Sequence, residues 1–403
     1  MQIPEKLCDG HTSLYLVTYN TVSTTAPAQR LQLFGLSRDI CLDVLLEGPI
    51  SRADLARRHD LTPGTVTRLT APLLRSGLLA ETDEPETGSP GRLGRPSKPL
   101  TFVADNHHFI GLKLTGEAIT GVLVDTSATV LRTDEQELAG RDVAGVTAAI
   151  AQLVNRLRDS QLRGVGIGLG GNVQADGVVQ RAPFLGWQSV PLADLVSREL
   201  GDLPTILSND VQGLTETEHW FGTGHGLDSF AVITLGAGVG YGLVCHERLV
   251  TSPDYGVGLI GHLPLDSIGP RCPRGHIGCA AAMLTDSSIA ATVSAGLGRA
   301  VSFDESLDLA LDGNPLAAEV VAASGRALGR LIALVANLAM PQRVIVTGEA
   351  VRLATIAARE VADGIRLNRE PLADEIDYVV EPVSENDWAR GAAVIAIQHF
   401  MLG

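Results

Sequence analysis

From Ser51 to Leu79 the chain reads SRADLARRHDLTPGTVTRLTAPLLRSGLL. Ser51 followed three residues later by Asp54 is typical of a helix start, because each side chain can bond the other residue's backbone N–H. Thr62 before Pro63 indicates a second start, since proline fits the first helical position, where its missing N–H costs nothing. The stretch therefore predicts two short helices joined by a tight turn.

The second predicted helix has an apolar side and a polar side. Val66, Leu69 and Leu73 recur at helical spacing and should face inward, while Pro72 should kink or shorten the helix. The outer side of the first turns suits a DNA major groove, where arginine bonds guanine edges and threonine hydroxyls bond bases or phosphates. The residues that we expect to contact DNA here are Thr62, Gly64, Thr65, Thr67 and Arg68.

The flanking segments add a first helix and a wing. The helix and the two strands of the wing are predicted at 30–47, 78–80 and 100–103. Between the strands lies a basic loop rich in glycine and proline, whose Arg92 and Arg95 we expect to enter the minor groove. This order resembles a winged helix-turn-helix of the MarR type, which implies double-stranded operator DNA as the partner. A small helical protein-interaction module is the alternative.

Length and charge divide the chain into two parts. At 403 residues the chain is too long for a single core, so more than one domain is expected. Residues 29–103 carry ten Lys/Arg and nine Asp/Glu, whereas residues 104–403 carry twenty and thirty-five. We expect the acidic part to resist non-specific binding to polyanions, and the basic groups of the front part to face DNA. The alternative for those basic groups is an ordinary solvated surface.

The cysteines and the hydropathy pattern indicate where the protein works. The five cysteines are scattered and odd in number, which is not a disulfide framework, so a reducing compartment is expected. No apolar run is long enough to cross a membrane, and the N-terminus lacks a charged segment followed by an apolar one. We therefore expect a soluble cytoplasmic protein with no membrane partner, in which residues 1–28 form a flexible N-terminal arm.

Beyond residue 104 the patterns of strands and helices alternate. Apolar stretches typical of buried strands are separated by helical periodicity and by glycine-rich turns. Such alternation predicts an α/β body of two lobes with a cleft between them. Two strands joined by a turn are predicted in each of 109–125 and 230–244, and single strands at 129–137, 164–169, 204–207 and 343–347. The main helices are predicted at 143–157, 193–200 and 316–338.

Five motifs in a fixed order make the body similar to a known family. The motifs are Asn209-Asp210, Glu218 to Gly222 (EHWFG), Gly236 to Gly240 (GAGVG), Gly261-His262, and Cys272 to Cys279. They resemble the ROK family (repressors, open reading frames, kinases), and the layout over 29–403 resembles its regulator branch. The resemblance implies an actin-like ATPase fold behind the winged helix-turn-helix. The DNA-binding domain would then span 29–103 and the ROK domain 104–403, with lobes at 104–225 plus 386–403 and at 226–385.

Two departures from the family's kinases argue against catalysis. The kinases place ATP and its metal with an aspartate where this chain has Lys113, and a lysine cannot hold Mg²⁺. Ala237 replaces a phosphate-loop threonine. Asp210 matches the general base of the family, but a base without ATP has nothing to drive. We therefore expect no enzyme activity and no bound ATP, and an active sugar kinase fused to a DNA-binding domain is the alternative.

The sugar site that the resemblance implies is also reduced. Leu259 and Ala281 stand where the family has carboxylates for sugar hydroxyls, and each lost partner weakens binding. Three outcomes follow: a weakly bound sugar or sugar phosphate, a different effector, or none. In another interpretation, Asn209 and Asp210 only cap a helix. The residues left to bind an effector are Gly171, Asn172, Asn209, Asp210 and His262.

The zinc site that the resemblance implies is incomplete. Family members use one histidine and three cysteines, and here His262, Cys272 and Cys279 remain. Arg274 stands at the middle cysteine, where its charge disfavours a cation, and His276 occupies a position that the family does not use as a ligand. Zinc binding is thus one interpretation. The other is a loop held by packing, with two buried free thiols.

Together these features predict a sequence-specific transcriptional regulator, and more specifically a repressor. The ROK body would form a homodimer or homotetramer, because winged-helix regulators usually read two half-sites. An effector in the cleft would bias the spacing of the paired winged helices by binding one arrangement more tightly. A further alternative is a constitutive DNA-binding protein whose body has lost effector binding and only oligomerises.

Overall fold

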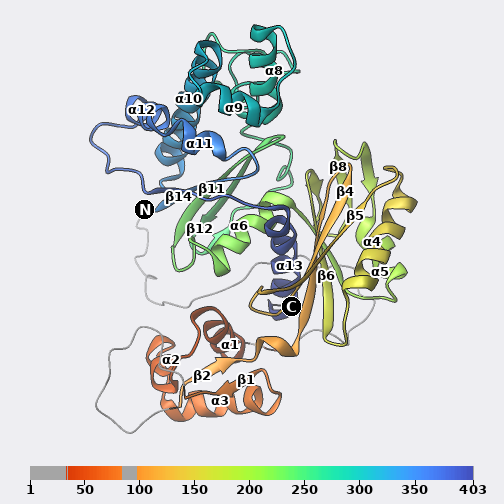
Figure 1. The fold of residues 1–403 in the computed structure, drawn as a ribbon. Coiled ribbons are helices and arrows are strands. Elements are labelled where there is room, and N and C mark those ends of the chain that lie inside the picture. The colour runs from red at the N-terminus through yellow and green to blue at the C-terminus, as the bar shows by residue number, and fades with distance from the viewer. Residues whose placement is uncertain (1–32, 34, 84–97, 403) are drawn as a thin grey trace, which may run out of the picture.

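The structure is a computed structural model that describes residues 33, 35–83 and 98–402. A small N-terminal domain of three helices lies at one end, and a larger body with two main sheets extends from it (Figure 1). The α/β class expected from the sequence is confirmed. The predicted arm at 1–28 and the wing residues Arg92 and Arg95 lie outside the described residues, so the expectations for them stay predictions.

The N-terminal domain contains the three predicted helices and the two predicted strands. The hydroxyl oxygens of Ser51 and Thr62 cap the second and third helices by accepting the backbone N–H of Asp54 (3.1 Å) and of Thr65 (3.2 Å). The two strands pair antiparallel. The elements are α1 (Leu36–Glu47), α2 (Arg52–Arg58), α3 (Pro63–Arg75), β1 (Leu79–Glu81) and β2 (Leu100–Phe102).

Two helices of this domain bear on the predicted bounds, and the first differs from them. The first helix begins at Leu36 rather than at residue 30, because Gly35 before it has a left-handed backbone (φ 53°) that interrupts a right-handed helix. The third helix is not shortened, since it runs through Pro72 to Arg75; the kink expected as the other outcome stays a prediction. Proline removes only the bond from its own nitrogen to the carbonyl of Arg68, so the turn after it can still form.

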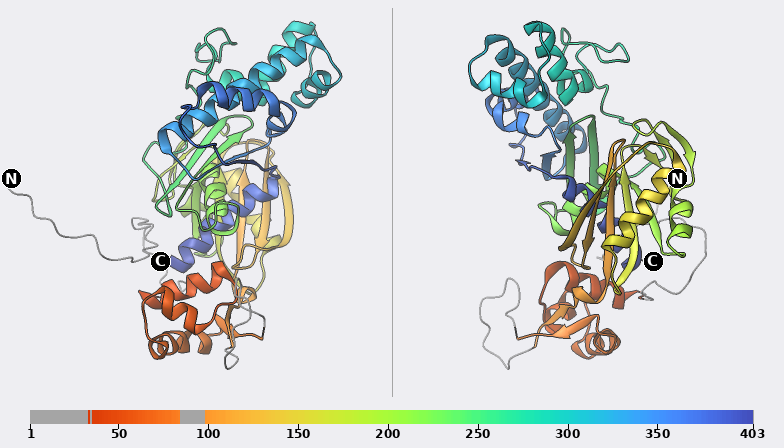
Figure 2. Two further views of the ribbon diagram at one scale, coloured as in Figure 1. Left: turned by 90° about the vertical axis from the view of Figure 1, so that its left-hand side faces the viewer. Right: turned by 45° about the vertical axis from the view of Figure 1, so that its right-hand side comes forward.

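The first sheet of the body is mixed, with the strand order β10-β6-β3-β4-β5. Helices α4 and α5 pack on one of its faces, and their apolar side chains share a core cluster with that face (Figure 2). Beside it lie a 3₁₀ turn, η1 (Ala104–Asn106), and a small sheet of β7 (Asn172–Val173), β8 (Val179–Ala182) and β9 (Trp187–Val190). The main elements are β3 (His108–Leu114), β4 (Ala118–Val124), β5 (Val130–Glu137), β6 (Leu162–Leu169), β10 (Thr205–Asn209), α4 (Val143–Leu157) and α5 (Leu192–Glu199).

The second sheet repeats the pattern of the first, with the order β13-β12-β11-β14-β15. In both sheets three antiparallel strands continue into two parallel ones. The strands are β11 (Ser229–Leu235), β12 (Val239–Cys245), β13 (Arg248–Leu249), β14 (Arg343–Thr347) and β15 (Tyr378–Val380). The helices at this end are α7 (Ala280–Leu284), α8 (Asp286–Leu297), α9 (Phe303–Leu311), α10 (Pro315–Ala339), α11 (Arg352–Ile356) and α12 (Ala358–Asn368).

Two helices, α6 (Asp210–Phe221) and α13 (Glu385–Leu402), lie between the sheets (Figure 1). α13 packs very closely on the first sheet: a Cβ on Gly166 would lie 1.8 Å from the carbonyl oxygen of Ala392, so only glycine fits there. The far end of α13, including Phe400, belongs to the same core cluster as the N-terminal domain. The lobe boundaries expected from the resemblance stay a prediction. No helix in the described part of the chain is long and apolar enough to span a membrane.

Candidate functional site

The outward side of α3 carries the residues predicted to contact DNA. Thr62, Gly64, Thr67 and Arg68 are exposed, and Thr65 is half-buried. The hydroxyls of Thr62 and Thr65 lie 3.0 Å apart at the capped start of the helix, so they already have a partner within the protein. Arg68 has the longest side chain of the five, and arginine is the commonest side chain to bond a base edge. Base contact by these five residues stays a prediction.

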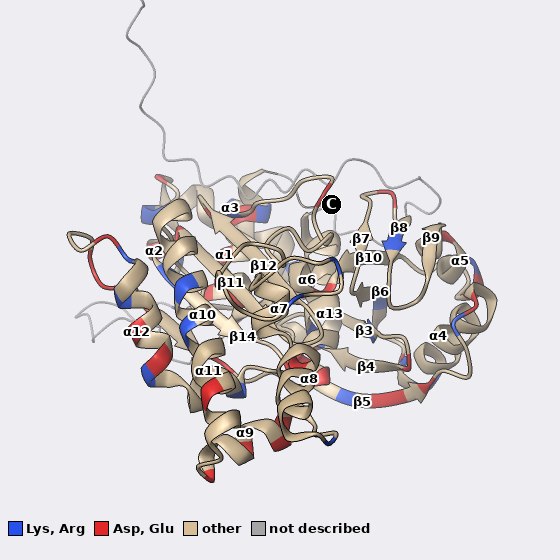
Figure 3. Cartoon of the chain, turned by 90° about the horizontal axis from the view of Figure 1, so that it is seen from above, with Lys and Arg blue, Asp and Glu red and all other residues tan. Residues whose placement is uncertain are grey.

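Only some of the arginines between Ser51 and Leu79 are free to bind a polyanion such as DNA. Three of its five arginines form ion pairs with acids of the same domain. The other two, Arg68 and Arg75, both lie on α3 and have no ion-pair partner among the described residues. Acidic residues of the body lie on other elements, including β5 and α9 (Figure 3). The paired arginines are Arg52 with Glu81, Arg57 with Asp54, and Arg58 with Glu47.

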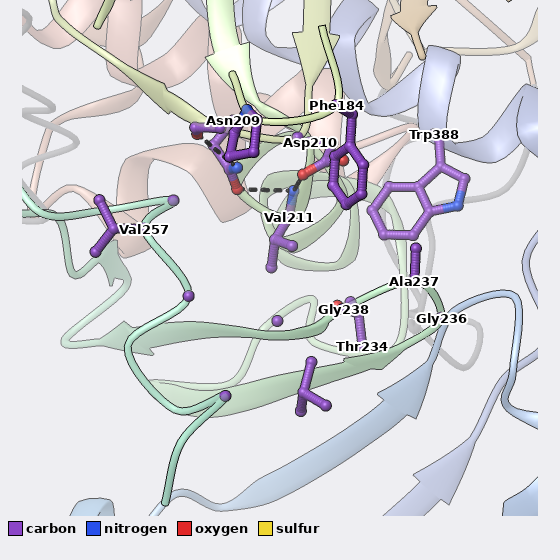
Figure 4. Close-up of a pocket in the computed structure, with 18 of the residues that line it drawn as sticks. Phe184, Asn209, Asp210, Val211, Thr234, Gly236, Ala237, Gly238, Val257 and Trp388 are labelled. Atoms are coloured by element: carbon purple, nitrogen blue, oxygen red, sulfur yellow. Dashed lines mark hydrogen bonds between the residues drawn. The ribbon is translucent and has the colours of Figure 1, made fainter. Parts of the chain in front are cut away.

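A cleft of about 1060 Å³ lies in the body and is lined by both main sheets and by α6 and α13. On its inner wall Lys113, from β3, forms an ion pair with Asp210, the first residue of α6; the two side chains are only 8% and 13% exposed. The Lys113 ammonium also lies 4.5 Å from the centre of the Trp388 ring. The other carboxylate oxygen of Asp210 accepts the N–H of Val211 (2.9 Å; Figure 4). Asp210, which matches the general base of the family's kinases, is therefore already paired with Lys113.

The asparagines expected to bind an effector form hydrogen bonds within the protein. Asn209 caps α6 by accepting the N–H of Val211 (3.0 Å), and its amide donates to the carbonyl of Gly171 (3.0 Å; Figure 4). The amide of Asn172 donates to two carbonyls of the 253–255 segment (2.8 and 2.7 Å). The capping role that the sequence offered as the alternative for Asn209 is therefore present. A ligand role for these residues stays a prediction.

The glycine-rich turn between β11 and β12 also faces a side chain of the protein itself. A Cβ on Gly236 would lie 2.2 Å from a carboxylate oxygen of Glu349, so Glu349 packs directly against this turn. Partial burial raises the pKa of Glu349, and the nearby carboxylates of Glu385 and Asp210 raise it further, while Lys113 lowers it. A carboxylate at this place repels a phosphate group, whereas the turn in a kinase must accept one.

Several residues of the cleft were not identified from the sequence, among them Phe184, Glu349 and Trp388. Glu349 follows Gly348 at the end of the buried strand β14, and ligand sites of α/β proteins often lie at the carboxyl ends of strands. That position was a usable signal. Trp388 is the first buried residue of an apolar helix, and Phe184 lies in a short turn. From the sequence alone, neither can be distinguished from an ordinary core residue.

The four residues His262, Cys272, His276 and Cys279 bring their ligand atoms within 4.8 Å of one another. The His262 Nδ1 lies 3.8 Å and 3.7 Å from the sulfurs of Cys272 and Cys279, and the His276 Nδ1 lies 3.6 Å from the Cys272 sulfur. These spacings fit a tetrahedron around zinc, whose bonds to nitrogen and sulfur are about 2.0–2.3 Å long. Arg274 is exposed and lines the cleft instead. The cluster can therefore hold zinc, with His276 as the fourth ligand.

The pKa values of this cluster are shifted in both directions. Burial raises the pKa of the Cys272 thiol, but hydrogen bonds from the backbone of Arg274 and His276 and from neighbouring side chains outweigh it, and the pKa falls to about 7. Burial and the charges of His276 and Arg274 lower the pKa of His262. Metal ligands must be thiolates and neutral imidazoles, so these two shifts favour binding. Burial and the neighbouring Cys272 raise the pKa of Cys279, which opposes binding.

Comparison with known proteins finds relatives over most of the chain. The family model described as "ROK family" matches residues 109–399. The DNA-binding transcriptional repressor Mlc of Escherichia coli (strain K12) is 25% identical over 366 residues, covering 86% of this chain and 89% of Mlc. The DNA-binding transcriptional dual regulator NagC of the same strain is 28% identical over 318 residues, covering 75% of this chain and 77% of NagC.

Solved structures share the architecture. A ROK family transcriptional regulator described as a homolog of the E. coli MLC protein superposes with a TM-score of 0.74 at 23% identity, covering 91% of this chain and 97% of that one. A ROK family glucokinase from Streptomyces griseus superposes with a TM-score of 0.60 at 24% identity, covering 72% and 98%. The body thus has the actin-like ATPase fold, which regulators and kinases share. With the match over residues 109–399, these likenesses show that the chain belongs to the ROK family.

Proposed function

We propose that this protein is a DNA-binding transcriptional regulator, and specifically a repressor. The observation that carries the proposal is the outward side of α3, where Arg68 and Arg75 are unpaired among the described residues and Gly64 and Thr67 are exposed. A recognition helix reads bases with its N-terminal residues, and arginine is its commonest specific contact. The names of Mlc and NagC, which are similar to this chain over most of its length, point the same way.

We also propose that the protein acts as a homodimer or homotetramer. Regulators of this kind place two recognition helices in successive major grooves, about 34 Å apart, which requires at least two chains. The body is the larger part, and α13 joins its core to that of the N-terminal domain. We therefore expect the body to hold the copies together and the N-terminal domains to read the operator.

The non-catalytic body is part of the proposal, and a sugar kinase is the second candidate because the fold is shared with the S. griseus glucokinase. Three features support a body without phosphoryl transfer: the pairing of Lys113 with Asp210, Ala237 in the glycine-rich turn, and Glu349 packed against that turn. A coupled assay of ATP consumption with a panel of hexoses separates the two candidates. Turnover at about 1 s⁻¹ or faster, as in ordinary enzymes, would establish the kinase.

We propose that the cluster of His262, Cys272, His276 and Cys279 holds a structural zinc ion. When bound, zinc would supply a cross-link between His262 and residues 272–279, within the connection from β13 to α7. Two thiols and two imidazoles form a closed tetrahedral set, which is typical of structural rather than catalytic zinc. In this proposal the histidine that the family does not use replaces its missing cysteine.

Selection of binding sites from a pool of random DNA duplexes tests the regulator function. The full-length protein is expected to enrich a motif with two-fold symmetry, whose half-sites lie about 10 base pairs apart or a multiple of that. The selection is repeated at two salt concentrations, because binding that rests on phosphate contacts alone falls steeply with salt without gaining a motif. Recovery of no common motif at either concentration contradicts the proposal.

A further inference from the structure

Large apolar side chains are exposed around the cleft. Phe184 is 54% exposed, Val250 48%, Val257 47% and Leu259 66%, and all four line the same cleft. They come from both sides of it, since Phe184 follows β8 whereas the other three follow β13; Figure 4 shows Phe184 and Val257 on different walls. Exposed apolar groups gathered in one concave place are typical of a ligand site.

Three polar side chains of the inner wall already have partners within the protein. Asp210 is paired with Lys113, and the amides of Asn172 and Asn209 donate to backbone carbonyls. A free sugar has hydroxyls over most of its surface and needs many unsatisfied donors and acceptors in return. Binding a sugar at these three side chains would require their bonds to break first, so they add little net affinity. The hydroxyl of Tyr255, which also lines the cleft, has no hydrogen-bond partner among the residues that the structure describes and is a polar group still open to a ligand.

The charge of the cleft disfavours an anion. Among the described residues that line it, three are Lys or Arg and five are Asp or Glu, a balance of −2. Lys113 is neutralised by Asp210, whereas Glu349 and Glu385 have no ion-pair partner within the described part of the chain. A phosphate or carboxylate entering this field would be repelled. The volume of about 1060 Å³ fits a small molecule rather than a folded partner.

We propose that the cleft binds an uncharged small molecule with an aromatic or branched apolar group, rather than a free sugar or a sugar phosphate. If the ligand contains a sugar, most of its affinity for the cleft comes from the apolar group attached to that sugar. The apolar part packs against Phe184, Val257 and Leu259. That this ligand acts as an effector rests on the proposed regulator function, whereas its binding to the cleft does not.

Binding to the full-length protein without DNA tests the proposal. The ligands are phenyl β-D-glucopyranoside, methyl β-D-glucopyranoside and glucose 6-phosphate, measured by isothermal titration calorimetry, and the uncharged fluorescent probe N-phenyl-1-naphthylamine. We expect the phenyl glucoside to bind about tenfold more tightly than the methyl glucoside, because a buried ring removes much apolar surface from water. We expect the probe to bind and glucose 6-phosphate not to.

Two serine variants locate the binding site. Leu259→Ser removes one apolar group of the cleft, whereas Ile268→Ser removes an exposed apolar group (91% exposed) that does not line it. Leu259→Ser is expected to weaken binding of the phenyl glucoside and the probe about fivefold or more, and Ile268→Ser to leave it unchanged.

Several results would overturn the proposal: equal affinities for the two glucosides, tightest binding of glucose 6-phosphate, no binding of either aromatic ligand, or equal effects of the two variants. A change of oligomeric state in Leu259→Ser, seen by sedimentation velocity, would instead make this apolar surface a contact between copies. Selection of DNA sites tests the regulator function, and its outcome is judged independently of ligand binding. If the protein still selects a DNA motif while the aromatic ligands fail to bind, only the ligand inference is lost.

Discussion

The Lys113 ammonium and the Asp210 carboxylate are paired inside the cleft, beside the ring of Trp388. The pair joins the middle of the first sheet to the start of α6. It satisfies two charges that would otherwise be buried without partners, and it occupies the position at which a kinase of this fold needs a free base. One residue, lysine in place of aspartate, therefore changes both the electrostatics and the chemistry of the cleft.

Breaking this pair should destabilise the body. We expect Lys113→Met to lower the free energy of unfolding by about 3 kcal/mol, because it leaves the buried carboxylate of Asp210 without its partner. Adding Asp210→Asn should recover part of the loss, since the remaining charge is then removed as well. Urea unfolding measures both variants. Arg366→Ala, which removes an exposed ion pair with Asp363, is the control and should change the free energy of unfolding little. If Arg366→Ala destabilised the protein as much as Lys113→Met does, the Lys113–Asp210 pair would not have the special weight of a buried pair.

The proposed zinc site predicts the metal content of single variants. The wild-type protein should carry one zinc per chain by elemental analysis, and His276→Ala should lose most of it, as should Cys272→Ser. Cys41→Ser serves as the control, because Cys41 is buried in the N-terminal domain and is not part of the cluster. Chelation of the wild type should also lower its melting temperature, because the metal binds only the folded state. Unchanged zinc in His276→Ala would show that the fourth ligand is another group.

The junction between the two domains should be sensitive to acid through His107. Burial lowers its pKa to about 4, and the charges of Arg163 and His108 add to the effect. Its Nδ1 accepts a hydrogen bond from Arg163 (3.0 Å), and its ring packs against Phe400. The folded state thus binds this proton more weakly than the unfolded state does. The stability that depends on neutral His107 is complete above about pH 6.5 and is lost as the pH falls toward 4.

The variant His107→Gln isolates this contribution. Thermal unfolding of the wild type and of the variant is compared at several pH values between 7 and 4, a range that reaches the pKa of His107 in the folded state, which is about 4. The wild type should lose its advantage over the variant as the pH falls, because glutamine does not titrate. A difference between the two proteins that stays constant across this range would exclude His107 as the acid-sensitive group.

The elements of the fold could be predicted because their signals are local. The helix at 143–157 and the strand at 343–347 were predicted with the bounds that the structure shows. Ser51 and Thr62 indicated helix starts because each caps its helix by bonding a residue only three positions later in the chain. Local patterns of this kind involve neighbours in the sequence, so they can be identified without knowing the packing.

The arrangement of the cleft could not be predicted, because it depends on packing between distant segments. Lys113 and Asp210 are 97 residues apart and meet because β3 shares a sheet with β10, the strand after which α6 begins. His276 approaches Cys272 because Gly275, with a left-handed backbone (φ 88°), reverses the chain between them. The sequence shows which residues are present at these positions, but pairing and turn geometry decide what they do.

The most direct test of the regulator function compares two arginines of the N-terminal domain. Fluorescence anisotropy measures the affinity of the full-length protein for the DNA site found by selection, at fixed salt. Arg68→Ala should weaken binding about tenfold or more, because a contact between arginine and a base edge contributes about 1–3 kcal/mol. Arg57→Ala is the matched control, since this arginine lies on α2 and is already paired with Asp54. Equal losses, or no loss in Arg68→Ala, would contradict recognition of DNA by α3.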